Sequence, residues 1–260
     1  HVSTTPLANA NMSGTSADSA AMLTIRDLRR RWIPTKERLV KATRNGESHP
    51  LPIRLHRAFS WLAAVEALTD SEQLDQKLIF RWIALNSLYG RWDGKIDEPT
   101  RDAESLRRFL STIIRLDHDV LLAASLQTHK PLAMSILEDE YVNDYFWRMV
   151  REDRQFRPGR TRRLAEEWYR EANWTQLLDE LLDRVYLVRC QLIHDAATFE
   201  SKINRQTVRR CGRMLEIVIQ SVLIVMIDHG LTTDWGELCY PPISQSNLPA
   251  NPSARPSRPK

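Results

Sequence analysis

The stretch from residue 174 to residue 193 carries an apolar side chain at every third or fourth position. This alternation matches the turn of an α-helix, about 3.6 residues, and predicts a long helix with one continuous apolar stripe. The stripe consists of Leu178, Leu181, Val185, Val188 and Leu192. A helix of this kind packs its stripe against neighbouring elements.

A second long helix is predicted over residues 202–229, after the short connector 194–201. Gly230 is placed to end it. Long helices joined by short connections favour antiparallel neighbours, so the two segments indicate a helical bundle. The apolar face of the second helix carries Cys211, Leu215, Val218, Val222 and Val225.

The earlier part of the chain also shows helical rather than strand-like spacing. Only eight glycines in 260 residues argue against a turn-rich β fold, and we expect an all-α chain: a helical bundle with extra N-terminal and inserted helices. The helices are predicted over 23–43, broken near Pro34; 53–68; 71–89, ended by Gly90; two or three within 100–152, split near Lys130; and 161–171.

Composition divides the chain into three parts. We expect a disordered N-terminal tail over 1–21, a helical domain over 22–242 and a disordered tail rich in Pro and Ser over 243–260. No secretory signal is seen, and the longest apolar run, 217–227, is too short to span a bilayer. These features, with three cysteines and no C-x-x-C pair, favour a soluble cytoplasmic protein without membrane contact.

An arginine and a histidine stand five positions apart at the end of the first long helix, as Arg189 and His194. Residues at this spacing differ by about 140° of rotation, so the two converge only if the helix ends between them. Arg189 falls beside the apolar stripe and would be partly enclosed. One alternative is purely structural: Arg189 forms a salt bridge with a neighbouring helix, and His194 caps the helix C-terminus.

Four segments resemble, in order, a group of uncharacterised bacterial HEPN proteins: PIRLHRAFSWLAAVEAL, LIFRWIALNSLYGRW, RVYLVRCQLIHDAATFESKINRQTV and DWGELCYPP. The resemblance covers most of residues 30–242 and includes the mark of the HEPN family, Arg followed after four to six residues by His. It implies a helical bundle that dimerises and brings two Arg and His sets to one cleft. Many such proteins are metal-independent endoribonucleases, often toxins or antiviral effectors, whereas others are binding or assembly modules.

The resemblance makes Arg189 and His194 the candidate catalytic residues. Histidine titrates near neutral pH and can move protons to or from the 2′-hydroxyl and the leaving 5′-oxygen of RNA. A fixed guanidinium stabilises the negative charge of the transition state with paired hydrogen bonds. Two positions depart from the family pattern: Cys190 replaces a polar residue, often Asn, and Asp195 replaces a frequent Gly. The Asp195 carboxylate would either hold the imidazole or repel a phosphate.

Two further features are candidate supports. Asn86 is predicted on the apolar side of its helix, as a buried amide that orients Arg189 or satisfies another polar group. The segment RMVREDRQFRPGRTRR (148–163) is a candidate RNA-binding patch, or else a solvated charged face, in a chain with 30 Arg and 7 Lys. Its candidate phosphate contacts are Arg154, Arg157, Arg160, Arg162 and Arg163.

The remaining motifs point away from cofactor chemistry. Cys190 and His194 have a spacing that two metal ligands can use, but no second Cys or His pair lies nearby, and no glycine-rich phosphate loop occurs. We therefore expect no metal and no cofactor. The expected partners are RNA as substrate, a second copy of the chain, and an antitoxin or regulatory protein. The two hypotheses are an endoribonuclease and a non-catalytic module that binds nucleic acid or protein.

Overall fold

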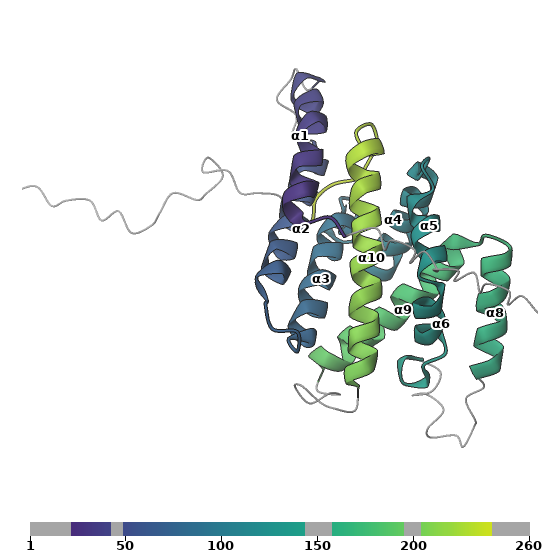
Figure 1. Cartoon of the computed structure of the whole chain (residues 1–260). Coiled ribbons are helices and arrows are strands. Elements are labelled where there is room, and N and C mark those ends of the chain that lie inside the picture. The colour runs from purple at the N-terminus through teal and green to yellow at the C-terminus, as the bar shows by residue number, and fades with distance from the viewer. Residues whose placement is uncertain (1–21, 43–48, 144–157, 195–203, 241–260) are drawn as a thin grey trace, which may run out of the picture.

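A computed structural model describes residues 22–42, 49–143, 158–194 and 204–240 of the protein. These residues are all-α, apart from one small β-hairpin (Figure 1). The strands β1 (Trp92–Asp93) and β2 (Glu98–Pro99) pair antiparallel. The helices are α1 (Ile25–Ala42), α2 (Pro50–Ala67), α3 (Leu74–Tyr89), α4 (Asp102–Leu116), α5 (Leu121–Thr128), α6 (Lys130–Leu137), a 3₁₀ turn η1 (Glu140–Val142), α8 (Pro158–Arg170), α9 (Trp174–Ile193) and α10 (Arg205–His229).

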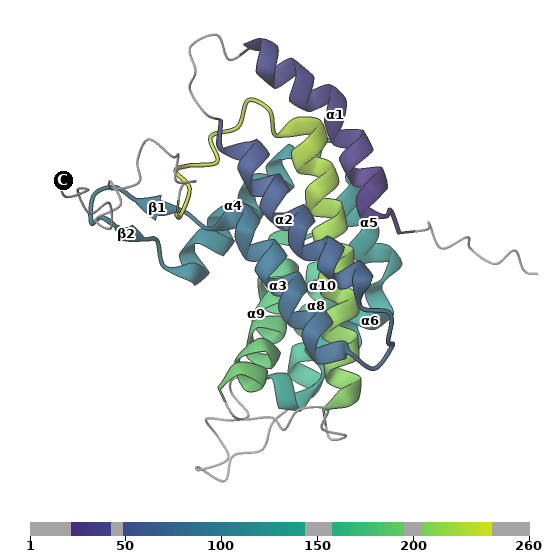
Figure 2. The same cartoon turned by 90° about the vertical axis from the view of Figure 1, so that its left-hand side faces the viewer.

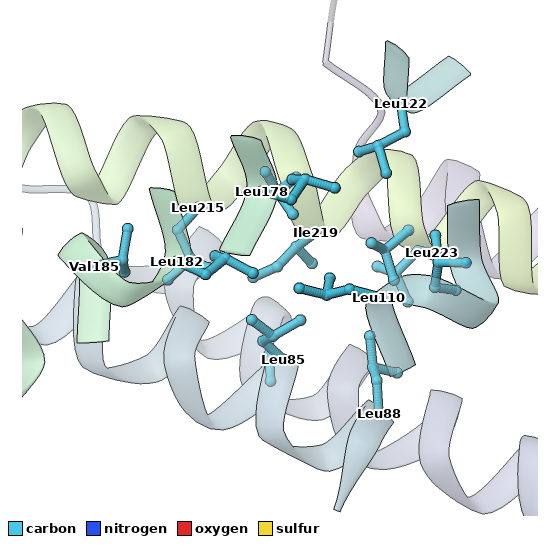
Figure 3. Packing of buried hydrophobic residues seen from close by; sticks show 14 of the residues in the cluster. Leu85, Leu88, Leu110, Leu122, Leu178, Leu182, Val185, Leu215, Ile219 and Leu223 are labelled. Atoms are coloured by element: carbon cyan, nitrogen blue, oxygen red, sulfur yellow. The ribbon is translucent and has the colours of Figure 1, made fainter. Parts of the chain in front are cut away.

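Helix α10 lies at the centre of the bundle and packs against α1, α3, α4, α5, α6 and α9 (Figure 1). All five apolar residues predicted for its stripe are buried, as are the first four of the α9 stripe. Figure 3 shows how side chains from α9 and α10 meet those of α3, α4 and α5 in the core. The periodicity of the two long segments therefore predicted both the helices and the faces that they bury.

Helix α9 has the predicted bounds. Its N-terminus is capped by Asn173, whose side chain accepts a hydrogen bond from the Gln176 N–H at 3.2 Å. Helix α10 begins three residues later than expected, at Arg205, and ends at His229 with Gly230 as the C-cap. The split expected near Lys130 is also present, because α5 ends at Thr128 and α6 begins at Lys130.

The predicted break at Pro34 is wrong, because α1 continues through this residue. Proline removes one backbone N–H from the helix ladder and leaves the carbonyl one turn earlier, that of Arg30, without its usual donor. Pro34 is exposed, so this carbonyl is on the solvent side of α1, where water can replace the donor. The buried face of α1, with Leu28, Trp32 and Leu39, holds the helix on the bundle.

The β1–β2 hairpin was not predicted. It projects from the bundle beside the segment that follows α10, drawn in yellow in Figure 2. The Trp92 N–H donates to the Glu237 carbonyl at 3.3 Å, and Arg91 forms a bridge with Leu238. The chain after α10 thus returns to the C-terminal end of α3. Within the described ranges, no helix is long and apolar enough to cross a membrane.

Candidate functional site

Arg189 lies in the penultimate turn of α9 and is half-buried, as its place beside the apolar stripe predicts. Its guanidinium carbon is 5.7 Å from the centre of the Tyr186 ring, one turn earlier. Its Nη1 is 3.9 Å from Sγ of Cys190. Tyr186 in turn packs on Trp82 of α3, with ring centres 5.7 Å apart. The arginine is therefore held against an aromatic surface that joins α9 to α3.

No carboxylate forms an ion pair with Arg189 in the part of the chain that the structure describes, and its buried Nε has no hydrogen-bond partner. The structural alternative required a salt bridge between Arg189 and a neighbouring helix. The described residues contain no such salt bridge. A half-buried guanidinium with unused donors is costly unless a ligand or water completes its hydrogen bonds. Among the described residues, Arg189 therefore keeps a donor that no carboxylate of the chain occupies.

A small network of titratable groups at the C-terminal end of α3 interacts electrostatically with Arg189. The Tyr89 hydroxyl donates to Oδ1 of Asp102, the first residue of α4, at 2.8 Å. Burial, followed by the Asp102 charge, raises the pKa of Tyr89 well above its usual value, and Arg189 acts in the opposite direction. A hydrogen bond with Cys190 is the main cause that raises the pKa of Tyr186. Arg189 therefore supplies positive charge to a pair of tyrosines that stay protonated.

His194 is the C-cap of α9, with φ −107° and ψ 39°, so the helix does end between Arg189 and His194 as the spacing required. The His194 N–H donates to the Cys190 carbonyl at 2.9 Å, and the side chain is exposed. Within the described residues, no hydrogen bond joins the imidazole to Arg189. One chain therefore presents the two candidate groups at the same helix end without direct contact.

The prediction of a buried amide at Asn86 is wrong, because Asn86 is exposed. The buried stripe of α3 contains Leu78, Trp82, Leu85 and Tyr89, and Asn86 lies about 100° around the helix from Leu85. Its backbone carbonyl accepts the Gly90 N–H at 2.9 Å, and its side chain lines a surface cavity between α3 and α4. No contact between Asn86 and Arg189 is present among the described residues, so the expected orienting role has no support.

The predicted arginine patch is only partly described. Arg154 and Arg157 lie outside the described residues, as does Asp195. Arg160, Arg162 and Arg163 are exposed at the start of α8. Nη1 of Arg162 is 3.5 Å from Glu138, and its Nε is 3.1 Å from Glu166. This side chain serves surface ion pairs, which favours the interpretation as a solvated charged face.

Sequence reasoning missed a buried arginine that binds the same C-terminal end of α3. Arg54 of α2 is 1 % exposed, and burial lowers its pKa to about 10. A detectable signal was present, because Arg54 stands on the same helical face as the buried Leu51, Leu55 and Ala58. Its guanidinium donates to five backbone carbonyls, those of Leu88, Gly90, Trp235, Gly236 and Glu237.

No cluster of three or more His, Cys, Asp or Glu side chains that could hold a metal ion occurs within the described ranges. Comparison of the chain with known protein families, with curated proteins and with solved structures gives no significant match.

Proposed function

We propose that the protein is a metal-independent endoribonuclease that cleaves RNA through attack of the 2′-hydroxyl, with Arg189 and His194 as its catalytic residues. The observation that carries the proposal is the state of Arg189: a half-buried guanidinium with no carboxylate partner among the described residues, five positions before an exposed histidine at the end of the same helix. An arginine that serves only the core is normally paired.

Arg189 has the properties that phosphate stabilisation requires. The Tyr186 ring lies against its guanidinium, which restricts the orientation of the fork. Partial burial lowers the effective dielectric around the charge, so hydrogen bonds to a phosphorane-like transition state are stronger than in bulk water. These bonds strengthen as additional negative charge develops on the phosphate oxygens, and this difference between ground state and transition state lowers the barrier.

His194 supplies the proton transfer in this proposal. Its exposed side chain at the end of α9 is open to solvent and to substrate. An imidazole titrates near neutral pH, so it can accept the proton of the 2′-hydroxyl or protonate the leaving 5′-oxygen. No metal-bound water is required for either step, because the nucleophile belongs to the RNA.

A second copy of the chain completes the site in this proposal. Tyr186, Arg189, Cys190 and Ile193 share one face of α9, because they are spaced by three and four residues. Tyr186 is 41 % exposed and Ile193 is 45 % exposed, so this face presents apolar surface around the arginine. A two-fold contact through this face brings two sets of Arg189 and His194 together, which compensates for their separation within one chain.

A non-catalytic binding module is the second candidate function. It is favoured by the absence of direct contact between His194 and Arg189 within the described part of the chain. It is also favoured by the packing of Arg189 on Tyr186 and Cys190, which a structural role would equally explain.

Incubation of the purified chain with single-stranded RNA tests the first proposal. We expect cleavage of RNA but not of DNA of the same sequence, because DNA lacks the attacking 2′-hydroxyl. EDTA leaves the rate unchanged. His194→Ala lowers the rate by about a hundredfold or more, the usual scale for a lost general acid or base. Arg189→Ala does likewise, and the double variant loses little more, because the two residues act as a unit.

His56→Ala is the matched control, since His56 is an exposed histidine on α2, outside the proposed site. It should cleave RNA at the wild-type rate. Circular dichroism establishes that all variants are folded. If the wild type and His194→Ala leave RNA equally intact while Arg189→Ala unfolds, the two residues are structural and the binding-module function stands.

A further inference from the structure

A cavity of about 510 Å³ lies between the C-terminal end of α3, the start of α4 and the segment that returns after α10. Figure 2 shows these three segments meeting where the hairpin leaves the bundle. Among the described residues, four arginines and one acidic residue line the cavity. They are Arg54, Arg57, Arg91, Arg101 and Asp102, which leaves a formal lining charge of +3.

Two of these arginines are held by backbone rather than by carboxylates. Arg54 donates to five carbonyls, and Arg57 donates to the carbonyls of Cys239 at 3.0 Å and Tyr240 at 2.5 Å. A carbonyl satisfies a donor but cancels no net charge. The positive charge around the cavity is therefore fixed in place and not neutralised by its partners.

The N-terminus of α4 contributes a second set of donors. Helix α4 has 15 residues, and the side chain of its N-cap, Arg101, makes no capping hydrogen bond. The N–H groups in the first turn of a helix have no partner within the helix and attract anions. Ser105, in that first turn, lines the cavity, is 2 % exposed, and has a buried hydroxyl with no hydrogen-bond partner. A ligand that enters the cavity can supply the hydrogen bond that this hydroxyl does not make within the described chain.

We propose that this cavity binds a phosphate monoester group. The oxygens of the dianion accept hydrogen bonds from the first-turn amides of α4 and from the Ser105 hydroxyl. The guanidinium groups of Arg91 and Arg101 balance its charge. Asp102 opposes this arrangement with one negative charge, which the four lining arginines outweigh, and its carboxylate is hydrogen-bonded to the Tyr89 hydroxyl at 2.8 Å. Neither Arg189 nor His194 lines this cavity, and the proposal does not rest on the proposed catalysis.

The dimensions of the cavity indicate what carries the phosphate. A volume of about 510 Å³ exceeds that of a free phosphate ion and falls in the range of small-molecule sites, roughly 300–1,000 Å³. Tyr240, another lining residue, is 73 % exposed and offers an aromatic face for stacking. The two sources of the group are therefore a free phosphorylated small molecule and the 5′-phosphate end of a nucleic acid.

Isothermal titration of the full chain distinguishes these sources. The titrants are inorganic phosphate, an oligodeoxynucleotide with a 5′-phosphate, and the same oligodeoxynucleotide with a 5′-hydroxyl. None of them has a 2′-hydroxyl to attack, so the result is independent of RNA cleavage. Binding of phosphate and of the 5′-phosphorylated strand, but not of the 5′-hydroxyl strand, supports a nucleic acid end. Binding of inorganic phosphate alone supports a small phosphorylated ligand.

Two variants locate the binding. Arg101→Ala is expected to weaken phosphate binding about tenfold, the effect of one lost charge-assisted hydrogen bond. Ser105→Ala is expected to weaken it severalfold without unfolding the chain. Arg107→Ala is the matched control, because Arg107 is an exposed arginine on α4 that does not line the cavity. The proposal is overturned if phosphate does not bind, if the 5′-hydroxyl strand binds equally well, or if Arg101→Ala and Arg107→Ala behave alike.

Discussion

Arg54 places a positive charge in the interior of the bundle. Only 1 % of the surface of this residue is exposed. Its guanidinium joins the end of α3 to the segment that follows α10, through carbonyls on both. Burying the charge opposes folding, whereas the satisfied carbonyls favour it. The balance depends on the five carbonyl contacts of the two Nη groups, since the buried Nε has no hydrogen-bond partner among the described residues.

Arg54→Met is therefore expected to lower the free energy of unfolding by about 3–5 kcal/mol, because five backbone carbonyls lose their guanidinium donor and, of these, the Glu237 carbonyl still accepts the Trp92 N–H. Urea denaturation followed by circular dichroism measures the loss. Arg29→Met, at an exposed position on α1, should change stability by less than about 0.5 kcal/mol. Equal stability of the two variants would show that water replaces the guanidinium.

Asp179 on α9 makes stability dependent on pH. Burial is the main cause that raises its pKa above the ordinary value of 3.8, and its Oδ1 has no hydrogen-bond partner. The folded state therefore favours the protonated acid, and its contribution to stability is lost as the pH rises through the folded pKa. Asp179→Asn should raise the urea midpoint at pH 7, with the gain disappearing below pH 3.8. Glu37→Gln, at an exposed site on α1, should show no such gain.

At the scale of elements, the β1–β2 hairpin and the segment after α10 form one unit at the end of α3. Gly236 has φ +69°, a conformation that favours glycine, and a Cβ added there would collide with the Arg91 guanidinium. The glycine thus allows the returning segment to lie against Arg91, one of the residues that line the proposed phosphate cavity. The backbone conformation of Gly236 therefore affects the position of Arg91 in the cavity lining.

Gly236→Ala should lower the free energy of unfolding by about 1–2 kcal/mol, the cost of a left-handed alanine, and should weaken phosphate binding by displacing Arg91. Thermal denaturation and the phosphate titration measure the two effects. Gly159→Ala on α8 is the control, since a Cβ there meets nothing within 4 Å. It should leave phosphate affinity unchanged and stability equal or slightly higher. Unchanged phosphate affinity in Gly236→Ala would remove Arg91 from the site.

At the scale of the whole molecule, the proposed ribonuclease requires two chains. The exposed face of α9 around Arg189 is expected to form a two-fold dimer, because Tyr186 and Ile193 present apolar surface on both sides of the arginine. One chain has a mass of 30.2 kDa. Light scattering at tens of micromolar, on the order of usual assay concentrations, should therefore give twice this mass.

Ile193→Glu should make the protein monomeric, because the dimer contact would bury the new negative charge. RNA cleavage should be lost together with dimerisation. Leu164→Glu is the control: Leu164 is 39 % exposed on α8, away from the proposed face. A wild-type protein that remains strictly monomeric would remove the shared-cleft mechanism.

The sequence by itself determined the helices and most of the faces that they bury, because helical periodicity is a local property of the chain. The α9 and α10 stripes are the clearest examples, and the enclosure of Arg189 followed from its place beside one of them. The same reasoning wrongly predicted that Asn86 is buried. Asn86 lies at the edge of the buried stripe of α3, where the packing of neighbouring helices determines whether a side chain is exposed.

Only the tertiary structure decided which distant residues meet. The contact of Arg54 with Trp235, Gly236 and Glu237 joins positions more than 180 residues apart, and no local pattern encodes it. The same holds for the cavity, whose lining comes from α2, α3, α4 and the segment after α10. Such sites arise from packing of whole elements, and packing depends on long-range contacts that the periodicity of a single segment cannot specify.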